Sequence, residues 1–256
     1  MILQIKRLQR GFTLIEMAMV LVIFGLLLAA VLVSLQAQHN FALQTETGNT
    51  LNIARKALLG FAQTQGRLPC PATNNGTAVF PDDTGTASPN ASGTCAQQVG
   101  FLPAATLGIQ PADAQGFALD GWNNRIRYAV NQANNLGVLN NDFTTTNAMA
   151  SLGIASLQPN LRVCASQTGV TATKCSGGTE TNFLINNAVA VIYSLGATGG
   201  LASGGTDEDK NLDGDAVFVS HDITAAGAPN GEFDHLVTWI SPYVLYNAMI
   251  QAGQLH

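Results

Sequence analysis

An uncharged apolar segment near the N-terminus constrains this chain more than any other feature. Residues 17–35 contain no Asp, Glu, Lys or Arg. A helix of about 20 apolar residues is long enough to cross the ~30 Å hydrocarbon core of a bilayer. The pattern therefore predicts a transmembrane segment over about residues 14–36. The residues before it include Lys6, Arg7 and Arg10, and this positive flank predicts a cytoplasmic N-terminus with the rest of the chain across the membrane.

One acidic residue, Glu16, lies at the start of this segment, within the run G-F-T-L-I-E that begins at Gly11. A carboxylate at the edge of a membrane span is energetically expensive, so its presence there indicates a function. The run followed by uncharged residues resembles the N-terminus of type IV pilins and type II secretion pseudopilins. The resemblance implies that a prepilin peptidase cuts between Gly11 and Phe12 and methylates the new terminal Phe12. It also implies that Glu16 meets the terminal amine of a neighbouring subunit in a filament.

Two other interpretations of the N-terminus stay open. An ordinary secretory signal has a basic region, an apolar core and then a cut, here near Ala37, but this apolar core is long and Glu16 would have no role. A plain uncleaved membrane anchor is the second alternative.

The region after the apolar segment continues as a helix by its pattern. No proline occurs from residue 12 to residue 66, and Gly66 and Pro69 then end the helix. Its second half is amphipathic, because the apolar residues Leu51, Ala54, Leu58 and Phe61 or Ala62 fall at helical spacing. We therefore expect a long helix over residues 12–66, with a lipid-facing first half and a second half that packs on a soluble domain.

The remainder, residues 67–256, predicts one globular α+β domain built on an antiparallel sheet. After the turn signal Asn123-Asn124, apolar residues alternate with others over 125–130, which predicts a half-buried strand. A short helix is expected near 146–157, and Ser241-Pro242 predicts the start of a C-terminal helix. Further strands are expected over 188–193, 216–219 and 236–240. The domain order is then a leader over 1–11, the long helix and the globular domain.

Four cysteines lie in the expected exported domain, where the compartment is oxidising. Three connectivities are open. Pairing of neighbours, Cys70–Cys95 and Cys164–Cys175, is favoured because each pair brackets a polar loop. A zinc site is disfavoured because no C-x-x-C occurs and the four histidines are scattered.

An acidic stretch over 206–215 carries oxygen ligands at alternate positions. Asp209, Asn211 and Asp213 are followed by Gly214, as in the opening of a calcium-binding loop. Position twelve would be Ser220, so the closing bidentate acid is missing, and Asp215 is one residue that can replace it. The stretch loosely resembles the late acidic loop in which some pseudopilins bind calcium. A solvated acidic turn is the alternative, so calcium is an optional ligand and no cofactor is required.

Charge and motifs exclude several classes of function. Without residues 1–11 the chain keeps 8 basic and 16 acidic residues, a formal charge of −8. A broad phosphate-binding surface needs clusters of Lys and Arg, so direct nucleic-acid binding is not expected. No nucleophile-elbow, phosphate-loop or zinc-protease motif occurs, so the chain is not expected to be an enzyme.

The sequence as a whole favours a structural subunit of a type IV pilus-like filament, a minor pilin or pseudopilin rather than a bulk subunit. Its expected partners are prepilin peptidase, other pilin or pseudopilin subunits and the inner membrane. We expect a single-pass bacterial inner-membrane protein with a periplasmic C-terminal domain, and an assembled filament in the periplasm or on the cell surface. A filament-borne adhesin or binding module, and a conventionally anchored exported protein of unknown activity, are the alternatives.

Overall fold

The computed structural model describes residues 13–73, 84–89, 91–134, 141–176, 182–199 and 204–255, with the side chains of 29–37 outside that description. The expected leader and the residues Gly11 and Phe12 of the expected cleavage site also lie outside the described residues. The chain divides into two compact units, Met1–Leu43 and Gln44–His256.

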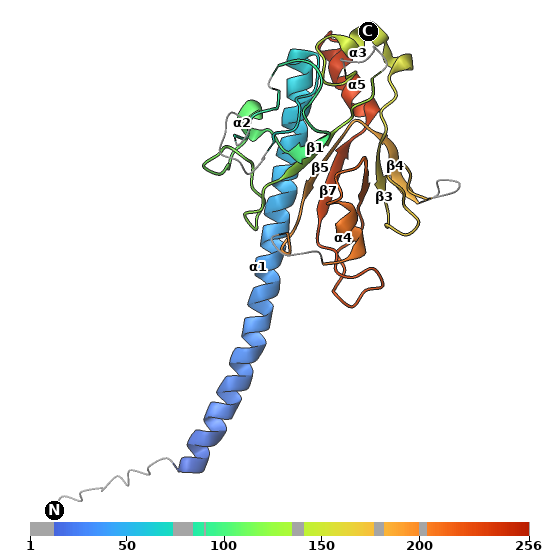
Figure 1. The fold of residues 1–256 in the computed structure, drawn as a ribbon. Coiled ribbons are helices and arrows are strands. Elements are labelled where there is room, and N and C mark those ends of the chain that lie inside the picture. The colour runs from blue at the N-terminus through green and yellow to red at the C-terminus, as the bar shows by residue number, and fades with distance from the viewer. Residues whose placement is uncertain are drawn as a thin grey trace, which may run out of the picture. The chain divides into compact units, whose positions relative to one another are not determined.

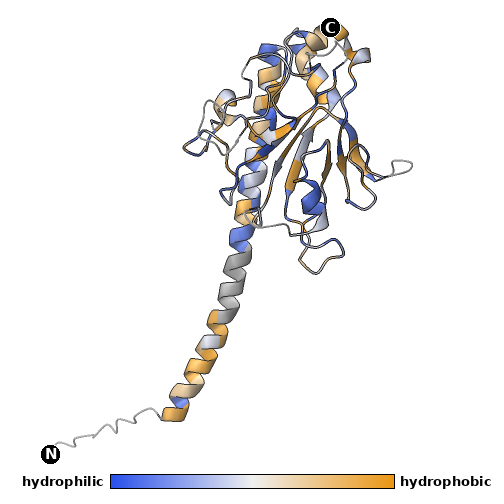
Figure 2. Ribbon diagram, in the orientation of Figure 1, coloured by the Kyte–Doolittle hydropathy of each residue, from blue (hydrophilic) through white to orange (hydrophobic). Residues whose placement is uncertain are grey.

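Helix α1 (Leu14–Gln65) is one continuous element of 52 residues, as the absence of proline predicts. Its apolar residues gather in the N-terminal part (Figure 2), where the described side chains, such as Leu21 and Leu26, are exposed. Among the described residues, no helix has both the length and the apolar character needed to span a membrane. The transmembrane segment over about 14–36 stays a prediction.

The second unit contains the amphipathic part of α1. The predicted stripe is buried there, and Ala62 rather than Phe61 completes it, since Leu51, Ala54, Leu58 and Ala62 are all less than 5% exposed. The helix ends before Gly66, whose φ of +64° suits glycine best. The second unit therefore uses α1 as one layer of its core.

Two β-sheets form the rest of this unit (Figure 1). The first is antiparallel, with the order β1 (Val99–Phe101), β2 (Arg127–Val130), β5 (Ala190–Ser194) and β7 (Leu236–Ile240). The second has the order β4 (Phe183–Ala188), β3 (Leu161–Cys164) and β6 (Val217–Val219). In this second sheet β3 and β4 are antiparallel but β3 and β6 are parallel, a pairing that the sequence pattern does not predict.

Short helices complete the second unit. They are α2 (Ala104–Leu107), α3 (Ala148–Leu152), a 3₁₀ turn η1 (Ile154–Ser156), α4 (Thr206–Lys210) and α5 (Pro242–Gln251). The helix α5 begins as predicted, because Ser241 is its N-cap and accepts a hydrogen bond from Val244 N at 3.4 Å. The α+β fold class is confirmed, with a long N-terminal helix and antiparallel sheet structure.

The central strands of the four-stranded sheet, β2 and β5, are covered on both faces. One face packs with the α1 stripe, through residues such as Tyr128 and Val130 of β2. The other face packs against the three-stranded sheet, through Ala129 of β2 together with Val163 and Phe218. The predicted alternation is confirmed except at Ala129, since Tyr128 and Val130 are buried and Arg127 is half-buried, but Ala129 is also 0% exposed. The apolar run over 188–193 likewise divides between the end of β4 and β5.

Two disulfides fasten the domain, and they join the neighbouring cysteines. Cys70 and Cys95 are bonded with their Cα atoms 5.3 Å apart. Cys164, the last residue of β3, is bonded to Cys175 with a Cα separation of 5.4 Å. The first bond joins the segment after α1 to the approach to β1, and the second closes the loop after β3.

Candidate functional site

The first residues of α1 form a reciprocal cap. Glu16 Oε2 accepts hydrogen bonds from the backbone N–H and the hydroxyl of Thr13, each at 3.0 Å. In return, Glu16 N donates to Thr13 Oγ1 at 3.3 Å. This is a capping box, in which a Thr at the N-cap and a Glu three residues later satisfy each other's free groups. The acid also lies at the positive end of the helix dipole.

The cap gives Glu16 a local role that the sequence interpretation missed. The T-x-x-E spacing before an apolar run is itself the signal, and it was available in the sequence. Glu16 is exposed in the described structure, so its carboxylate can reach a further partner. The geometry thus provides an acid that is already oriented by Thr13 and accessible from outside.

The acidic stretch is folded around α4 and the turn that follows it. Asp209 is exposed, whereas Asn211 is 1% exposed. The Asn211 carboxamide accepts from Val219 N at 2.7 Å and donates to Val219 O at 3.0 Å, so it fixes β6 to α4. Asn211 is therefore used inside the domain, away from the exposed Asp209.

Two other candidate calcium ligands meet a lysine instead. Lys210 Nζ lies 2.5 Å from Asp213 Oδ2 and 2.5 Å from Asp215 Oδ2. Burial lowers the pKa of Lys210, but its hydrogen bonds to the two acids outweigh that and raise the pKa overall. Burial raises the pKa of Asp215, and Lys210 opposes that rise. The structure brings Asp213 and Asp215 together around an ammonium group, and calcium at this loop stays a prediction.

A second set of acids on α4 is buried. Asp207 Oδ1 accepts from Gln167 N at 2.6 Å, and Oδ2 lies 2.9 Å from Asn230 Nδ2 and 3.1 Å from His221 Nε2. Glu208 accepts from Gly204 N at 2.9 Å and from Asp234 N at 2.8 Å. These bonds tie the short helix α4 to the β3–β4 connection and to the β6–β7 connection, as well as to Gly204 just before the helix.

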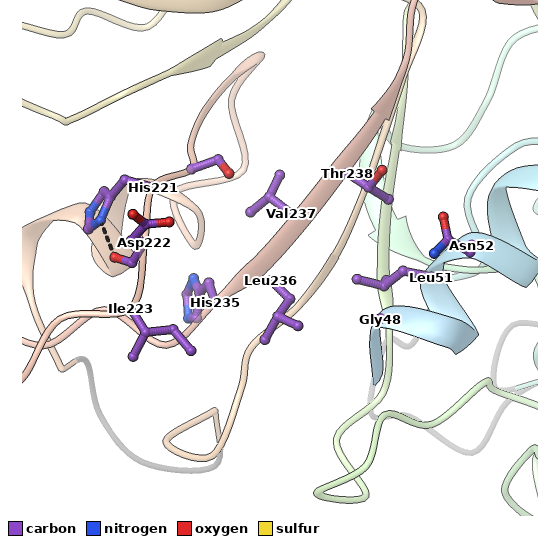
Figure 3. Close-up of a pocket in the computed structure, with 11 residues that line it drawn as sticks. Gly48, Leu51, Asn52, His221, Asp222, Ile223, His235, Leu236, Val237 and Thr238 are labelled. Carbon is purple, nitrogen blue, oxygen red and sulfur yellow. Dashed lines mark hydrogen bonds between the residues drawn. The ribbon is translucent and has the colours of Figure 1, made fainter. Parts of the chain in front are cut away.

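Beside these acids, the second unit has a groove of about 480 Å³ between the amphipathic part of α1 and β7. Figure 3 shows Leu51 and Asn52 of α1 on one side, and His235 with Leu236 on the other. The wall beyond β7 includes His221, whose Nδ1 lies 2.6 Å from the backbone oxygen of Asp222. The lining of the groove is a mixture of apolar and polar side chains.

The turn before β2 is held by a single buried acid, Asp120. Its carboxylate accepts from Trp122 N at 2.9 Å, Asn124 N at 2.8 Å and Ser194 Oγ at 2.5 Å. Burial raises the pKa of Asp120, and these hydrogen bonds oppose the rise. The predicted turn is confirmed at Asn123, whose φ is +66°. Thr47 Oγ1 of α1 accepts from Gly121 N at 2.9 Å, so the turn is also attached to the helix.

Comparison with known families finds the prokaryotic N-terminal methylation motif at residues 6–32. No curated protein and no solved structure matches the chain. The matched range contains Gly11, Phe12 and the capping pair Thr13 and Glu16. Over residues 6–32 the chain thus carries the N-terminal methylation motif that marks the type IV pilin and pseudopilin family.

Proposed function

We propose that this protein is a minor pilin or pseudopilin, a structural subunit that enters a type IV pilus-like filament after its leader is removed. The observation that carries the proposal is the methylation motif at residues 6–32. The cut then lies between Gly11 and Phe12, and Phe12 becomes the methylated N-terminus. The partners that follow from this are prepilin peptidase and other pilin subunits, and the role is structural rather than enzymatic.

The division of the chain supports the same proposal. Residues 1–11 are the leader and 12–66 the long helix, whose first part anchors the precursor in the inner membrane through about residues 14–36. Residues 67–256 are the exported domain. Its two disulfides fit an oxidising compartment, because thiols of cytosolic proteins are kept reduced. The long polar segments of this domain favour a minor or tip position over a bulk one.

Glu16 links the motif to assembly. In the single chain its carboxylate is satisfied by Thr13 at 3.0 Å. In a bundle of apolar helices a carboxylate is tolerated only when an opposite charge pairs with it. The amine of Phe12 on a neighbouring subunit is the charge that the proposed cleavage creates, and Thr13 keeps the acid oriented for it.

Mass spectrometry of protein extracted from membranes tests the proposal. We expect an N-terminus at N-methyl-Phe12 in cells with an active prepilin peptidase, and an intact leader in cells that lack it. A terminus near residue 38 indicates an ordinary secretory signal, and an intact leader in both strains indicates a plain anchor. Either result contradicts the proposed function. Filaments purified from the first strain should contain the processed chain.

A further inference from the structure

Two buried acids next to the groove have no cation to balance them. Glu208 and Asp234 are 1% and 8% exposed, and in the described part of the chain neither forms an ion pair. Glu208 uses both oxygens on backbone N–H groups, at 2.8 and 2.9 Å. Asp234 Oδ2 accepts from Thr198 N at 2.8 Å, but the buried Oδ1 has no hydrogen-bond partner among the described residues. A buried acceptor without a partner is costly, so Oδ1 indicates a missing ligand.

The neighbouring His235 does not supply the missing positive charge. It is 4% exposed, and its Nδ1 faces the amide nitrogen of Asn211 rather than a carboxylate. The Asn211 carboxamide, oriented by its two bonds to Val219, directs Nδ2 at His235 Nδ1 across 3.1 Å. Nδ1 therefore accepts that hydrogen bond and keeps a lone pair rather than a proton.

The three side chains converge. One carboxylate oxygen of Glu208, one of Asp234 and one ring nitrogen of His235 all lie within 4.8 Å of one another. We propose that these three residues hold a divalent metal ion of the zinc type, with the unpartnered Oδ1 of Asp234 as one ligand. The ion supplies the positive charge that the two buried carboxylates lack, and it joins α4 to the residues that lead into β7.

The donor set selects the class of metal. Zinc commonly takes three protein ligands from His, Asp and Glu and leaves a fourth position for water. Calcium takes six to eight oxygens and has little use for an imidazole. His235 also lines the groove in Figure 3, which gives the ion and its water a route to solvent. This site is separate from the loop of Asp213 and Asp215, where Lys210 already balances the acids.

Metal binding has a structural consequence that can be observed. If the ion takes Nδ1, it replaces the hydrogen bond from Asn211. If it takes Nε2, the ring proton moves to Nδ1, which can no longer accept from Asn211 Nδ2. Ligation must break that 3.1 Å contact in either case, while Asn211 keeps its bonds to Val219. The ¹⁵N shifts of the His235 ring therefore report the site directly.

The test uses the full chain in detergent, stripped with a chelator and then dialysed against zinc. Elemental analysis should find one zinc per chain, with a higher melting temperature and altered ring shifts of His235. Cobalt should bind in its place with the visible absorption of a tetrahedral site, and zinc should displace it. These readouts on the unaltered chain do not depend on whether a variant folds.

Matched variants locate the ion. Glu208→Gln and Asp234→Asn should each weaken zinc binding at least tenfold, while Asp209→Asn, an exposed acid on the same helix, should leave it unchanged. The proposal is wrong if the unaltered chain binds no zinc, in which case a shared proton neutralises the two acids. It is also wrong if zinc binding survives both substitutions, and loss of that binding in Asp213→Ala would then place the ion at the acidic loop. Neither result changes the expected N-terminus at Phe12. The proposed function is therefore tested independently of the metal site.

Discussion

Glu16 has one set of partners in the single chain and acquires another in the proposed filament. Thr13 caps it locally, and the capping box keeps the first turn of α1 defined. The proposed role in the filament depends on the negative charge of Glu16. The cap depends only on a hydrogen-bond acceptor at the end of a side chain of the same length. These two roles can be separated by substitution, because glutamine is also found at this position of a capping box.

We expect Glu16→Gln to preserve the cap and cleavage after Gly11 but to lower incorporation into filaments. Removing one member of a buried ion pair costs about 3–5 kcal/mol. Glu16→Ala should show the same assembly defect and should also fray the first turn of α1. Quantification of each variant in purified filaments, normalised to processed chain in the membrane, measures this. Normal incorporation of both variants would mean that Glu16 has no part in assembly.

A second residue-scale prediction concerns Asp120, which accepts three hydrogen bonds in the turn before β2. Asp120→Asn should lower the free energy of unfolding by about 1–3 kcal/mol at pH 7, because a neutral amide replaces a charged acceptor. Its oxygen can still accept from the two backbone N–H groups, but the nitrogen in place of Oδ2 cannot accept from the Ser194 hydroxyl. The native pKa of Asp120 is raised by burial, so the folded state binds its proton more readily than the unfolded state. The unaltered chain therefore gains stability as pH falls from 7 through this native pKa towards 4.

The stability difference between the unaltered chain and Asp120→Asn should accordingly widen as pH falls over that range. Urea unfolding at several pH values measures it, with Asp222→Asn, an exposed acid, as the control. A difference that narrows as the pH falls contradicts the raised pKa.

At the scale of elements, local sequence patterns predicted where helices and strands begin. They did not predict which other elements pack against or pair with them. The strand over 236–240 and the helix from Pro242 follow from alternation and from an N-cap, which are local signals. Burial of Ala129 on the second face of its sheet does not, because periodicity along one strand contains no information about a second layer. The parallel pairing of β3 with β6 is absent from the pattern for the same reason.

The candidate sites divide in the same way. Gly11, Phe12 and Glu16 lie within six consecutive residues, so sequence alone could predict their roles, which stay predictions. Glu208 and His235 come together only because the residues before β7 fold back against α4, and no spacing rule links positions so far apart. The pattern of the acidic stretch likewise assigned no role to Lys210, although its ammonium bonds to both Asp213 and Asp215.

Lys210 permits a direct test of calcium at the acidic loop. Lys210→Met should lower the melting temperature without calcium, because Asp213 and Asp215 are then left without a counter-ion. Calcium should restore the melting temperature of this variant. It should raise the melting temperature of the unaltered chain less, because there the ion must displace the ammonium group of Lys210. Thermal melting at zero and millimolar calcium checks this. In the double variant Lys210→Met and Asp213→Ala, calcium should no longer raise the melting temperature. If calcium leaves both melting curves unchanged, the calcium prediction is wrong.

For the whole molecule, the two disulfides make stability depend on the compartment in which the chain folds. The cysteines that they join lie 25 and 11 residues apart in the sequence. On the chain-entropy model each bond stabilises the domain by roughly 3 kcal/mol. A domain of this size is commonly stable by about 5–15 kcal/mol, so the loss of both is a large part of the total.

We therefore expect the reduced chain to unfold at a distinctly lower urea concentration than the oxidised chain. Replacement of Cys70 and Cys95 by alanine should cost slightly more than replacement of Cys164 and Cys175, because the longer loop gains more unfolded-state entropy. Non-reducing peptide mapping of protein from the periplasm provides the control. Four free thiols there contradict both the pairing and the assumed compartment.

The position of the cap also bears on how a peptidase recognises this chain. Helix α1 begins at Leu14, and Thr13 caps it, so the proposed cut between residues 11 and 12 precedes the first helical residue in the sequence. A protease must draw its substrate into an extended backbone, and a bond inside a stable helix resists this. If the chain is cut there, we expect the capping box to confine cleavage to the N-terminal side of Thr13, because the residues after it are held in the helix.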